Sequence, residues 1–198
     1  MNNKVWVEVN TKALTRNIRI IRKKIGSRVK LWAVVKSNAY GHGLLAFSHA
    51  AERLVDGFCA DSVIEGIKLR RSGITKRIIV LGPTLTGDNL ASAAKNKIEI
   101  SVSNFEALRM IVPLRARPRF HLKVDTGMHR QGIYITDIPR ALSLVKRHAL
   151  PMVGVYTHFA HAKDPRHRAF TKKQFKEFEN VRAMGRRAGF TSITYHAA

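Results

Sequence analysis

The sequence predicts an α/β protein built on a (β/α)8 barrel of the TIM type that stops short of closure. Short apolar runs alternate with helical patterns along all 198 residues. The runs are continuously apolar, which is typical of parallel strands covered by helices on both faces. Seven such runs follow the first one. A doubly wound sheet, with usually about five or six strands, is the competing architecture, and the strand number favours the barrel.

The first elements are a short β run and a helix. Val5–Val9 reads VWVEV, which predicts a strand. Apolar residues then recur at helical spacing from Leu14 to Ile25, and Gly26 predicts the end of that helix. The next predicted strand is Leu31–Lys36, with the sequence LWAVVK.

Six further apolar runs predict the remaining strands, and helical patterns fill the gaps between them. The runs are Gly57–Ala60, Arg77–Leu81, Ile98–Val102, Phe120–Val124, Met152–Tyr156 and Ile193–Tyr195. Capping boxes at Ser62–Glu65, Ser103–Glu106 and Thr171–Gln174 indicate where three of the helices begin. The sequence stops at Ala198 while still on a strand, so we expect a barrel that has been cut short, with residues 1–198 as one domain.

Composition points to a globular protein with an unusual charge. Hydrophobic residues make up 45% of the chain, and no apolar run approaches the roughly 18–20 residues of a membrane span. With no secretory signal and the single cysteine Cys59, we expect a cytoplasmic protein. The 36 Lys and Arg against 13 Asp and Glu give a net charge of +23. These cations fill the solvent faces of helices without interleaved aromatic residues, which predicts weak adhesion to polyanions and no specific nucleic-acid partner.

The segment AVVKSNAYGHG carries the first candidate site. Lys36 ends an apolar run, where partial desolvation favours the neutral amine that Schiff-base chemistry needs. Tyr40 lies in the glycine-containing loop that follows, where backbone N–H groups and a phenol can approach an anion. A lysine that merely extends its charged end from the strand to solvent is the structural alternative.

The segment HLKVDTGMHRQGI carries the second candidate site. Lys123 and Asp125 project to the same side of an extended run, and Arg130 follows in a turn between two glycines. An arginine at a strand end can clamp a carboxylate through two parallel hydrogen bonds. A structural Lys123–Asp125 ion pair and a surface Arg130 are the equally open alternative.

The segment VYTHFAHAKDP places His158 at the end of another strand. Its imidazole can stack on a ring or orient another group, or it can be a satisfied core histidine. The histidines show no metal-ligand spacing, so we expect no metal site.

Together these motifs resemble the N-terminal barrel of the alanine racemase family, which are pyridoxal-phosphate enzymes of fold type III. The resemblance runs over essentially the whole chain and includes VWVEVNTKALTRNI, LRRSGI and the closing HAA. It implies the cofactor pyridoxal 5'-phosphate and the interconversion of L- and D-alanine for peptidoglycan synthesis, with an amino acid as substrate and a homodimer as the family assembly.

The resemblance also implies a role for each candidate residue. Lys36 matches the lysine that holds the cofactor covalently and, once freed, acts as the base on one face of the substrate. Tyr40 matches the phenol that binds the phosphate, and His158 the imidazole against the pyridine ring. Arg130 matches the arginine that contacts the cofactor and the substrate carboxylate. Lys123 matches the lysine that is often carbamylated to position that arginine.

Departures from the family pattern limit the activity that we expect of this 198-residue chain by itself. The family serine that follows HAA, the last barrel strand and the C-terminal β domain with the second catalytic base lie beyond the chain. We therefore expect little racemisation and doubtful dimerisation from it alone, with a non-catalytic cofactor-binding barrel as the alternative. Val5–Val9 matches the strand that pairs with that β domain. His129 and Gln131 replace residues that are usually small and Leu, respectively.

Overall fold

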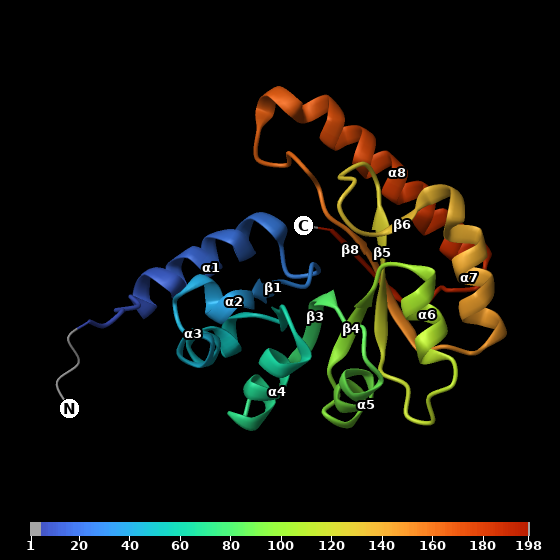
Figure 1. Ribbon diagram of the computed structural model, residues 1–198. Helices are drawn as coiled ribbons and strands as arrows, with labels where there is room; N and C mark the ends of the chain where they lie inside the picture. Colours follow the sequence, from blue (N-terminus) through green and yellow to red (C-terminus); the bar gives the residue numbers. More distant parts are fainter. Residues whose placement is uncertain (1–4, 198) are drawn as a thin grey trace. The chain divides into compact units, whose positions relative to one another are not determined.

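The computed structural model describes residues 5–197, which form two compact units that both alternate strands and helices (Figure 1). The first unit runs to Gly82 and includes residues 96–98. The second unit consists of Pro83–Lys95 and the chain from Glu99 onward.

The first unit is a three-stranded parallel sheet with its connecting helices. Strand β1 pairs with β2 at Trp32↔Gly57, and β2 pairs with β3 at Gly57↔Arg77. Its elements are α1 (Thr11–Ile25), β1 (Trp32–Val34), α2 (Lys36–Tyr40), α3 (Leu44–Ala51), the 3-10 turn η1 (Glu52–Leu54), β2 (Gly57–Ala60), α4 (Val63–Arg71) and β3 (Arg77–Pro83).

The second unit continues the same alternation. Its parallel strands follow the order β4-β5-β7-β8, and β6 pairs with the end of β5. The elements are α5 (Gly87–Lys95), β4 (Glu99–Val102), α6 (Phe105–Ile111), β5 (Phe120–Asp125), β6 (Ile133–Tyr134), η2 (Ile135–Asp137), α7 (Ile138–Arg147), β7 (Met152–Thr157), η3 (Pro165–His167), α8 (Arg168–Arg187) and β8 (Thr194–Ala197). Ala198, the last residue of the HAA motif, lies outside the described residues.

Fully buried strands form the cores of both units. All residues of β2, β4 and β5 are buried, as expected of parallel strands covered on both faces. Among residues 5–197, seven strands belong to successive parallel βα units. This confirms the predicted α/β class and agrees with an incomplete (β/α)8 barrel.

Most predicted elements occur where the sequence placed them. Gly57–Ala60 is β2 with the predicted bounds, and α1 ends at Gly26, whose φ of 78° a glycine adopts without strain. The predicted strand Leu31–Lys36 is shorter, because β1 ends at Val34. Val35 still donates its N–H to the Cys59 carbonyl at 2.8 Å, and the backbone leaves the sheet immediately afterwards.

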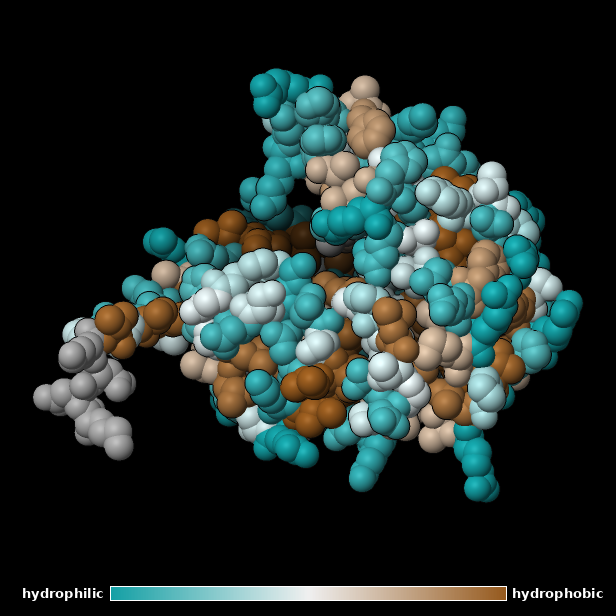
Figure 2. All heavy atoms as spheres, viewed as in Figure 1, coloured by the Kyte–Doolittle hydropathy of each residue, from teal (hydrophilic) through white to brown (hydrophobic). Residues whose placement is uncertain are grey.

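The predicted strand Val5–Val9 is wrong for the described chain. These residues pair with no strand among residues 5–197. A strand gains its stability from partners, and here the Val5, Trp6 and Val7 residues are 84%, 67% and 69% exposed. Figure 2 shows this apolar segment in brown beside the grey terminal atoms, whereas hydrophilic side chains cover much of the face over α8.

One of the three predicted capping boxes begins a helix as expected. Ser62 Oγ accepts the Glu65 N–H at 3.2 Å at the start of α4. The second cap lies one residue later, because Asn104 rather than Ser103 caps α6. The third prediction is wrong because α8 begins at Arg168, before the predicted cap.

Candidate functional site

The loop after β1 has an uncommon backbone conformation. Four consecutive non-glycine residues, Ser37–Tyr40, have φ values of 52°, 55°, 53° and 53°. This left-handed conformation costs an L-residue roughly 1–2 kcal/mol, so surrounding contacts must stabilise it. Lys36 lies at the point where the chain turns from the strand into this left-handed segment.

Two polar side chains hold the loop in place. The Glu65 carboxylate accepts the Asn38 N–H at 3.1 Å and the Asp61 N–H at 2.8 Å. The Asn38 Oδ1 in turn accepts the Leu44 N–H at 2.8 Å at the start of α3. The loop is therefore tied to α4 on one side and to α3 on the other.

This arrangement leaves an amine and a phenol available to a ligand. Lys36 is half-buried and Tyr40 is 61% exposed. Within residues 5–197, neither Lys36 Nζ nor Tyr40 Oη has a hydrogen-bond partner. An added Cβ at Gly41 would meet no atom within 4 Å, so the space beside the loop is open. An amine at a strand end and a nearby phenol fit the aldehyde and the phosphate of pyridoxal phosphate.

In the second unit, Lys123 lies in the buried strand β5 and is only 6% exposed. Its Nζ donates a hydrogen bond to Gln131 Oε1 at 3.1 Å. The Gln131 Nε2 donates to Ser103 Oγ at 3.1 Å. Lys123 Nζ also lies 5.6 Å from the centre of the Tyr156 ring, within the range of a cation–π interaction.

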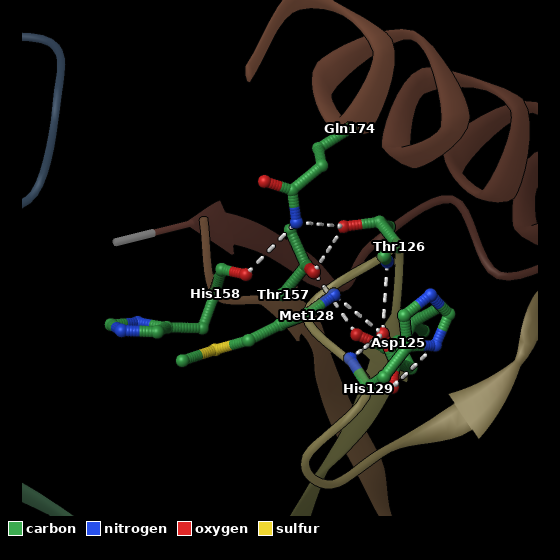
Figure 3. Close-up of polar contacts among 9 residues, drawn as sticks. Asp125, Thr126, Met128, His129, Thr157, His158 and Gln174 are labelled. Atoms are coloured by element: carbon green, nitrogen blue, oxygen red, sulfur yellow. Dashed lines mark hydrogen bonds and ion pairs between the residues drawn. The ribbon is translucent and has the colours of Figure 1, made fainter. Parts of the chain in front are cut away.

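Asp125 organises the turn that leads to Arg130. Its Oδ1 accepts the N–H groups of Gly127, Met128 and His129 at 2.9, 2.9 and 3.1 Å (Figure 3). The Asp125 carboxylate therefore works mainly as a backbone acceptor, and the exposed Arg130 guanidinium follows at the end of the turn. An exposed guanidinium on an ordered turn is suited to binding a carboxylate.

His158 follows β7 and is half-buried. The buried Gln174 of α8 donates from Nε2 to the His158 carbonyl at 3.4 Å and accepts the Ala160 N–H at 3.0 Å. Figure 3 shows the imidazole pointing away from these hydrogen bonds. The backbone of His158 is thus fixed by Gln174.

A buried polar chain, which the sequence did not predict, runs between the strands of the second unit. Glu99 and His121 are 4% and 1% exposed, and His121 Nε2 lies 2.8 Å from Glu99 Oε2. His121 Nδ1 lies 2.9 Å from His196 Nε2, and the His196 ring stacks on Tyr156 at 4.9 Å. The Tyr156 hydroxyl completes the chain through Ser101 Oγ at 2.8 Å.

Other chemistries find less support in the described part of the chain. No group of three or more His, Cys, Asp and Glu side chains in residues 5–197 is arranged to hold a metal ion. Burial raises the pKa of the Cys59 thiol to about 12, so this cysteine stays protonated and a poor nucleophile at neutral pH. Over the same residues, every helix is too short or too polar to cross a bilayer.

Comparison with known proteins identifies the family. The model of the alanine racemase N-terminal domain matches residues 9–198. The chain belongs to the alanine racemase family. The match includes both the Lys36 loop and the segment from Lys123 to His158, so all five candidate residues lie within it.

Individual relatives agree with this assignment. An alanine racemase of Listeria monocytogenes serotype 4b (strain F2365) is 39% identical over 181 residues, which are 89% of this chain and 48% of that protein. One of Citrifermentans bemidjiense is 34% identical over 203 residues, covering 97% of this chain and 53% of that protein. The chain thus spans about half the length of the curated relatives it matches.

Solved alanine racemases have the same fold. The Bacillus anthracis enzyme with bound L-Ala-P matches all of this chain and 52% of its own, with a TM-score of 0.91 and 30% identity. The Clostridium difficile 630 enzyme matches all of this chain and 56% of its own, with a TM-score of 0.91 and 28% identity. These likenesses confirm the incomplete barrel.

Several residues that support the candidate site escaped the sequence analysis. The sequence pattern places Glu65 only in a helix cap, yet its carboxylate binds the backbone of the Lys36 loop. The pattern also places Gln174 in a cap, but this residue is buried four residues before Phe178 on the inner side of α8. A polar residue on an otherwise apolar helix face was the available signal. Gln131 stands in the sequence only as a departure from the family pattern, and its hydrogen bonds to Lys123 and Ser103 follow from the structure.

Proposed function

We propose that the protein acts as a pyridoxal-phosphate-dependent alanine racemase in the cytoplasm, with residues 1–198 as its cofactor-binding barrel domain. The family match over residues 9–198 is the observation that carries this proposal, because it includes every candidate residue. Bound pyridoxal phosphate supplies an electron sink that makes the α-hydrogen of an amino acid acidic enough to remove. The product, D-alanine, would serve peptidoglycan synthesis.

The two proposed residues of the first unit act on the cofactor and on the proton. Lys36 binds the cofactor covalently and, as a free amine, removes the α-proton from one face of the substrate or returns it. Its half-buried position directly after Val35 places the amine at the end of the first strand. Tyr40 donates its exposed hydroxyl to the phosphate, and the Glu65–Asn38 hydrogen bond keeps both residues on one ordered loop.

The three residues of the second unit orient the reactants. Arg130 binds the substrate carboxylate, since a guanidinium provides two parallel donors. The His158 ring would hold the pyridine ring of the cofactor by stacking, and Lys123 would position Arg130. Inversion needs a second base on the opposite face. The family places that base in the half of the protein beyond this match, so we expect little racemisation from these 198 residues alone.

A spectroscopic experiment tests the cofactor site directly. We expect the purified chain with pyridoxal phosphate to show a visible absorption band that borohydride fixes covalently to Lys36. Lys36→Ala should abolish the band, whereas Lys12→Ala, on the exposed side of α1, should leave it unchanged. Mass spectrometry after reduction should locate the adduct on Lys36. A band that persists in Lys36→Ala, or a folded chain without any band, would contradict the proposal.

A further inference from the structure

Helix α1 of the first unit carries its apolar and its basic residues on opposite faces. Leu14, Ile18 and Ile25 recur at helical spacing on one face, where Ile18 is buried, and the helix contacts α3 and η1. Four exposed basic residues share the opposite face, spaced by four, three and four positions: Lys12, Arg16, Arg19 and Lys23. These four residues are named the α1 basic stripe, which follows the helix axis for about 16 Å.

No opposite charge balances the α1 basic stripe. Helix α1 contains no acidic residue. Within residues 5–197, the four side chains of the stripe make no ion pair or hydrogen bond. A carboxylate of the first unit instead binds Arg22, which donates to Asp56 Oδ2 at 2.7 Å. Because like charges four residues apart repel one another on a helix, an anionic partner would relieve the repulsion within the stripe.

The surface between these cations is partly apolar. Thr11, Thr15 and Ile20 lie beside the stripe and line a shallow groove of about 470 Å³ together with it. Threonine hydroxyls can donate hydrogen bonds to phosphate oxygens. Ile20 is 49% exposed, and it gains from burial only against a partner that offers apolar atoms next to its anionic groups.

Helix α8 shows that this arrangement is not a simple result of the high net charge. It is also rich in lysine and arginine, but Glu177 and Glu179 interrupt its basic residues. Arg182 forms an ion pair with Glu179 at 3.4 Å. The basic residues of α8 are therefore partly neutralised, whereas those of the α1 basic stripe are not.

The shape and chemistry of the stripe favour a lipid surface over a nucleic acid. A straight row of cations on one convex helix can meet a flat anionic surface along its whole length, and an exposed aliphatic side chain can enter the boundary between headgroups and acyl chains. A nucleic acid would be bound by stacking on aromatic side chains, and α1 contains none. A second copy of the same helix would bring like charges together.

We propose that the α1 basic stripe is a docking surface for a bilayer that contains anionic phospholipids. The helix lies parallel to the surface, with its cations at the lipid phosphates and Ile20 at the acyl boundary. Such attachment is peripheral, reversible and weakened by salt. It goes beyond the proposed racemase function and does not depend on it, because it involves neither the cofactor nor the substrate.

Binding is measured by sedimentation of the full chain with vesicles of phosphatidylglycerol and phosphatidylcholine in a ratio of about 1:2 at about 0.1 M salt. Vesicles of phosphatidylcholine alone are the lipid control, and we expect binding to the anionic vesicles only. Each basic residue near such a surface strengthens binding about fivefold. Replacing all four stripe residues with glutamine should therefore weaken binding at least about thirtyfold, even if only two of the four reach the surface.

A second set of four substitutions on α8 is the matched control. It removes the same number of exposed lysines and arginines: Lys172→Gln, Lys173→Gln, Arg186→Gln and Arg187→Gln. This variant should lose less than about threefold in affinity for the anionic vesicles. Equal losses in the two variants would show that total charge governs binding and would overturn the proposal. Wild-type binding that ignores the lipid charge would overturn it as well.

A fluorescence measurement keeps all four cations and so does not depend on the stability of the glutamine variant. Ile20→Cys is labelled with an environment-sensitive fluorophore in the native chain, where the buried Cys59 is protected. Emission should shift to shorter wavelength when anionic vesicles are added. The same label at Asn180→Cys, an exposed position of α8, should not respond. No shift at residue 20, or equal shifts at both positions, would contradict docking through α1.

A DNA duplex of about 20 base pairs separates the two kinds of polyanion. We expect weak, salt-sensitive binding to DNA that the α1 and α8 variants reduce equally. A loss of DNA affinity confined to the α1 variant would overturn the choice of a lipid partner.

Discussion

Asn38 contributes to the Lys36 loop in two separable ways, which the substitution Asn38→Ala removes together. Its Oδ1 accepts the Leu44 N–H at 2.8 Å and so caps α3. Its backbone has a φ of 55°, a left-handed conformation that asparagine tolerates better than alanine. Alanine can neither accept the hydrogen bond nor adopt this φ without strain.

The expected loss of stability follows from these two terms. Removing the cap costs about 1 kcal/mol. The left-handed backbone adds roughly 1 kcal/mol for a residue that lacks the asparagine side chain. The free energy of unfolding should therefore fall by about 2 kcal/mol, which lowers the melting temperature of a chain of this size by about 4–8 °C.

Asn104→Ala is the matched control, because Asn104 caps α6 through a bond of the same length, 2.8 Å, with an ordinary φ of −153°. Asn104→Ala should lose only the cap and so lower the free energy of unfolding by about 1 kcal/mol. Asn38→Gly removes the cap but accepts a positive φ, so it should cost about 1 kcal/mol and lie nearer to Asn104→Ala than to Asn38→Ala.

The assay is urea unfolding of the three variants and the wild type, followed by circular dichroism. Equal losses for Asn38→Ala and Asn104→Ala would refute the contribution of backbone strain. A glycine variant less stable than the alanine variant would refute it independently.

Three further predictions concern stability and reactivity. Burial alone would raise the pKa of Asp56, but hydrogen bonds from the backbone and from Arg22 at 2.7 Å bring it below its usual 3.8. Asp56→Asn should therefore lower the free energy of unfolding by about 1 kcal/mol at neutral pH. Urea titrations at several pH values should show this difference from wild type shrinking as the pH falls below about 4. A difference that does not depend on pH would contradict the prediction. Cys59, with a pKa raised to about 12 by burial, should react with a thiol reagent only when the chain unfolds, so stoichiometric labelling in native buffer would show the reasoning to be wrong. Gly132→Ala should cost about 2 kcal/mol or more, because the new Cβ would meet the β5 backbone. At Gly26 an added Cβ would meet no atom within 4 Å, so Gly26→Ala should lose stability only through the strain of its positive φ. Similar shifts in melting temperature for the two glycine variants would contradict the steric argument.

The buried strands were predictable because apolar residues recur along each of them. Gly57–Ala60 and Phe120–Asp125 lie in parallel sheet covered on both faces, so even the polar His121, Lys123 and Asp125 of the second strand are buried. The same rule failed at Val5–Val9, which has the right composition but no partner strand among residues 5–197. Apolar alternation indicates that a segment can pair, but only the fold determines whether a partner is present.

The site was only partly predictable, for a related reason. Lys36, Tyr40 and Arg130 stand in recognisable motifs at the ends of strands. The hydrogen bond that ties the loop of Lys36 and Tyr40 to α4 comes from a distant position, Glu65, which lies 27 residues after Asn38. Local patterns do not specify such contacts. Serine, alanine and tyrosine rarely adopt a positive φ, so the sequence does not predict one at residues 37, 39 and 40. The hydrogen bonds of Gln131 to Lys123 and Ser103 likewise depend on how β4 and β5 lie side by side, which a local pattern does not specify.

The left-handed segment Ser37–Tyr40 has a consequence for folding kinetics. A strained turn gains little from forming by itself, and the Glu65 carboxylate that stabilises it belongs to a helix formed later in the chain. The segment should therefore become ordered only after β2 and α4 have assembled, late on the folding pathway. Substitutions in it should accelerate unfolding far more than they slow folding. The residues nearest to the proposed chemistry would then be the last of the first unit to form and the first to open.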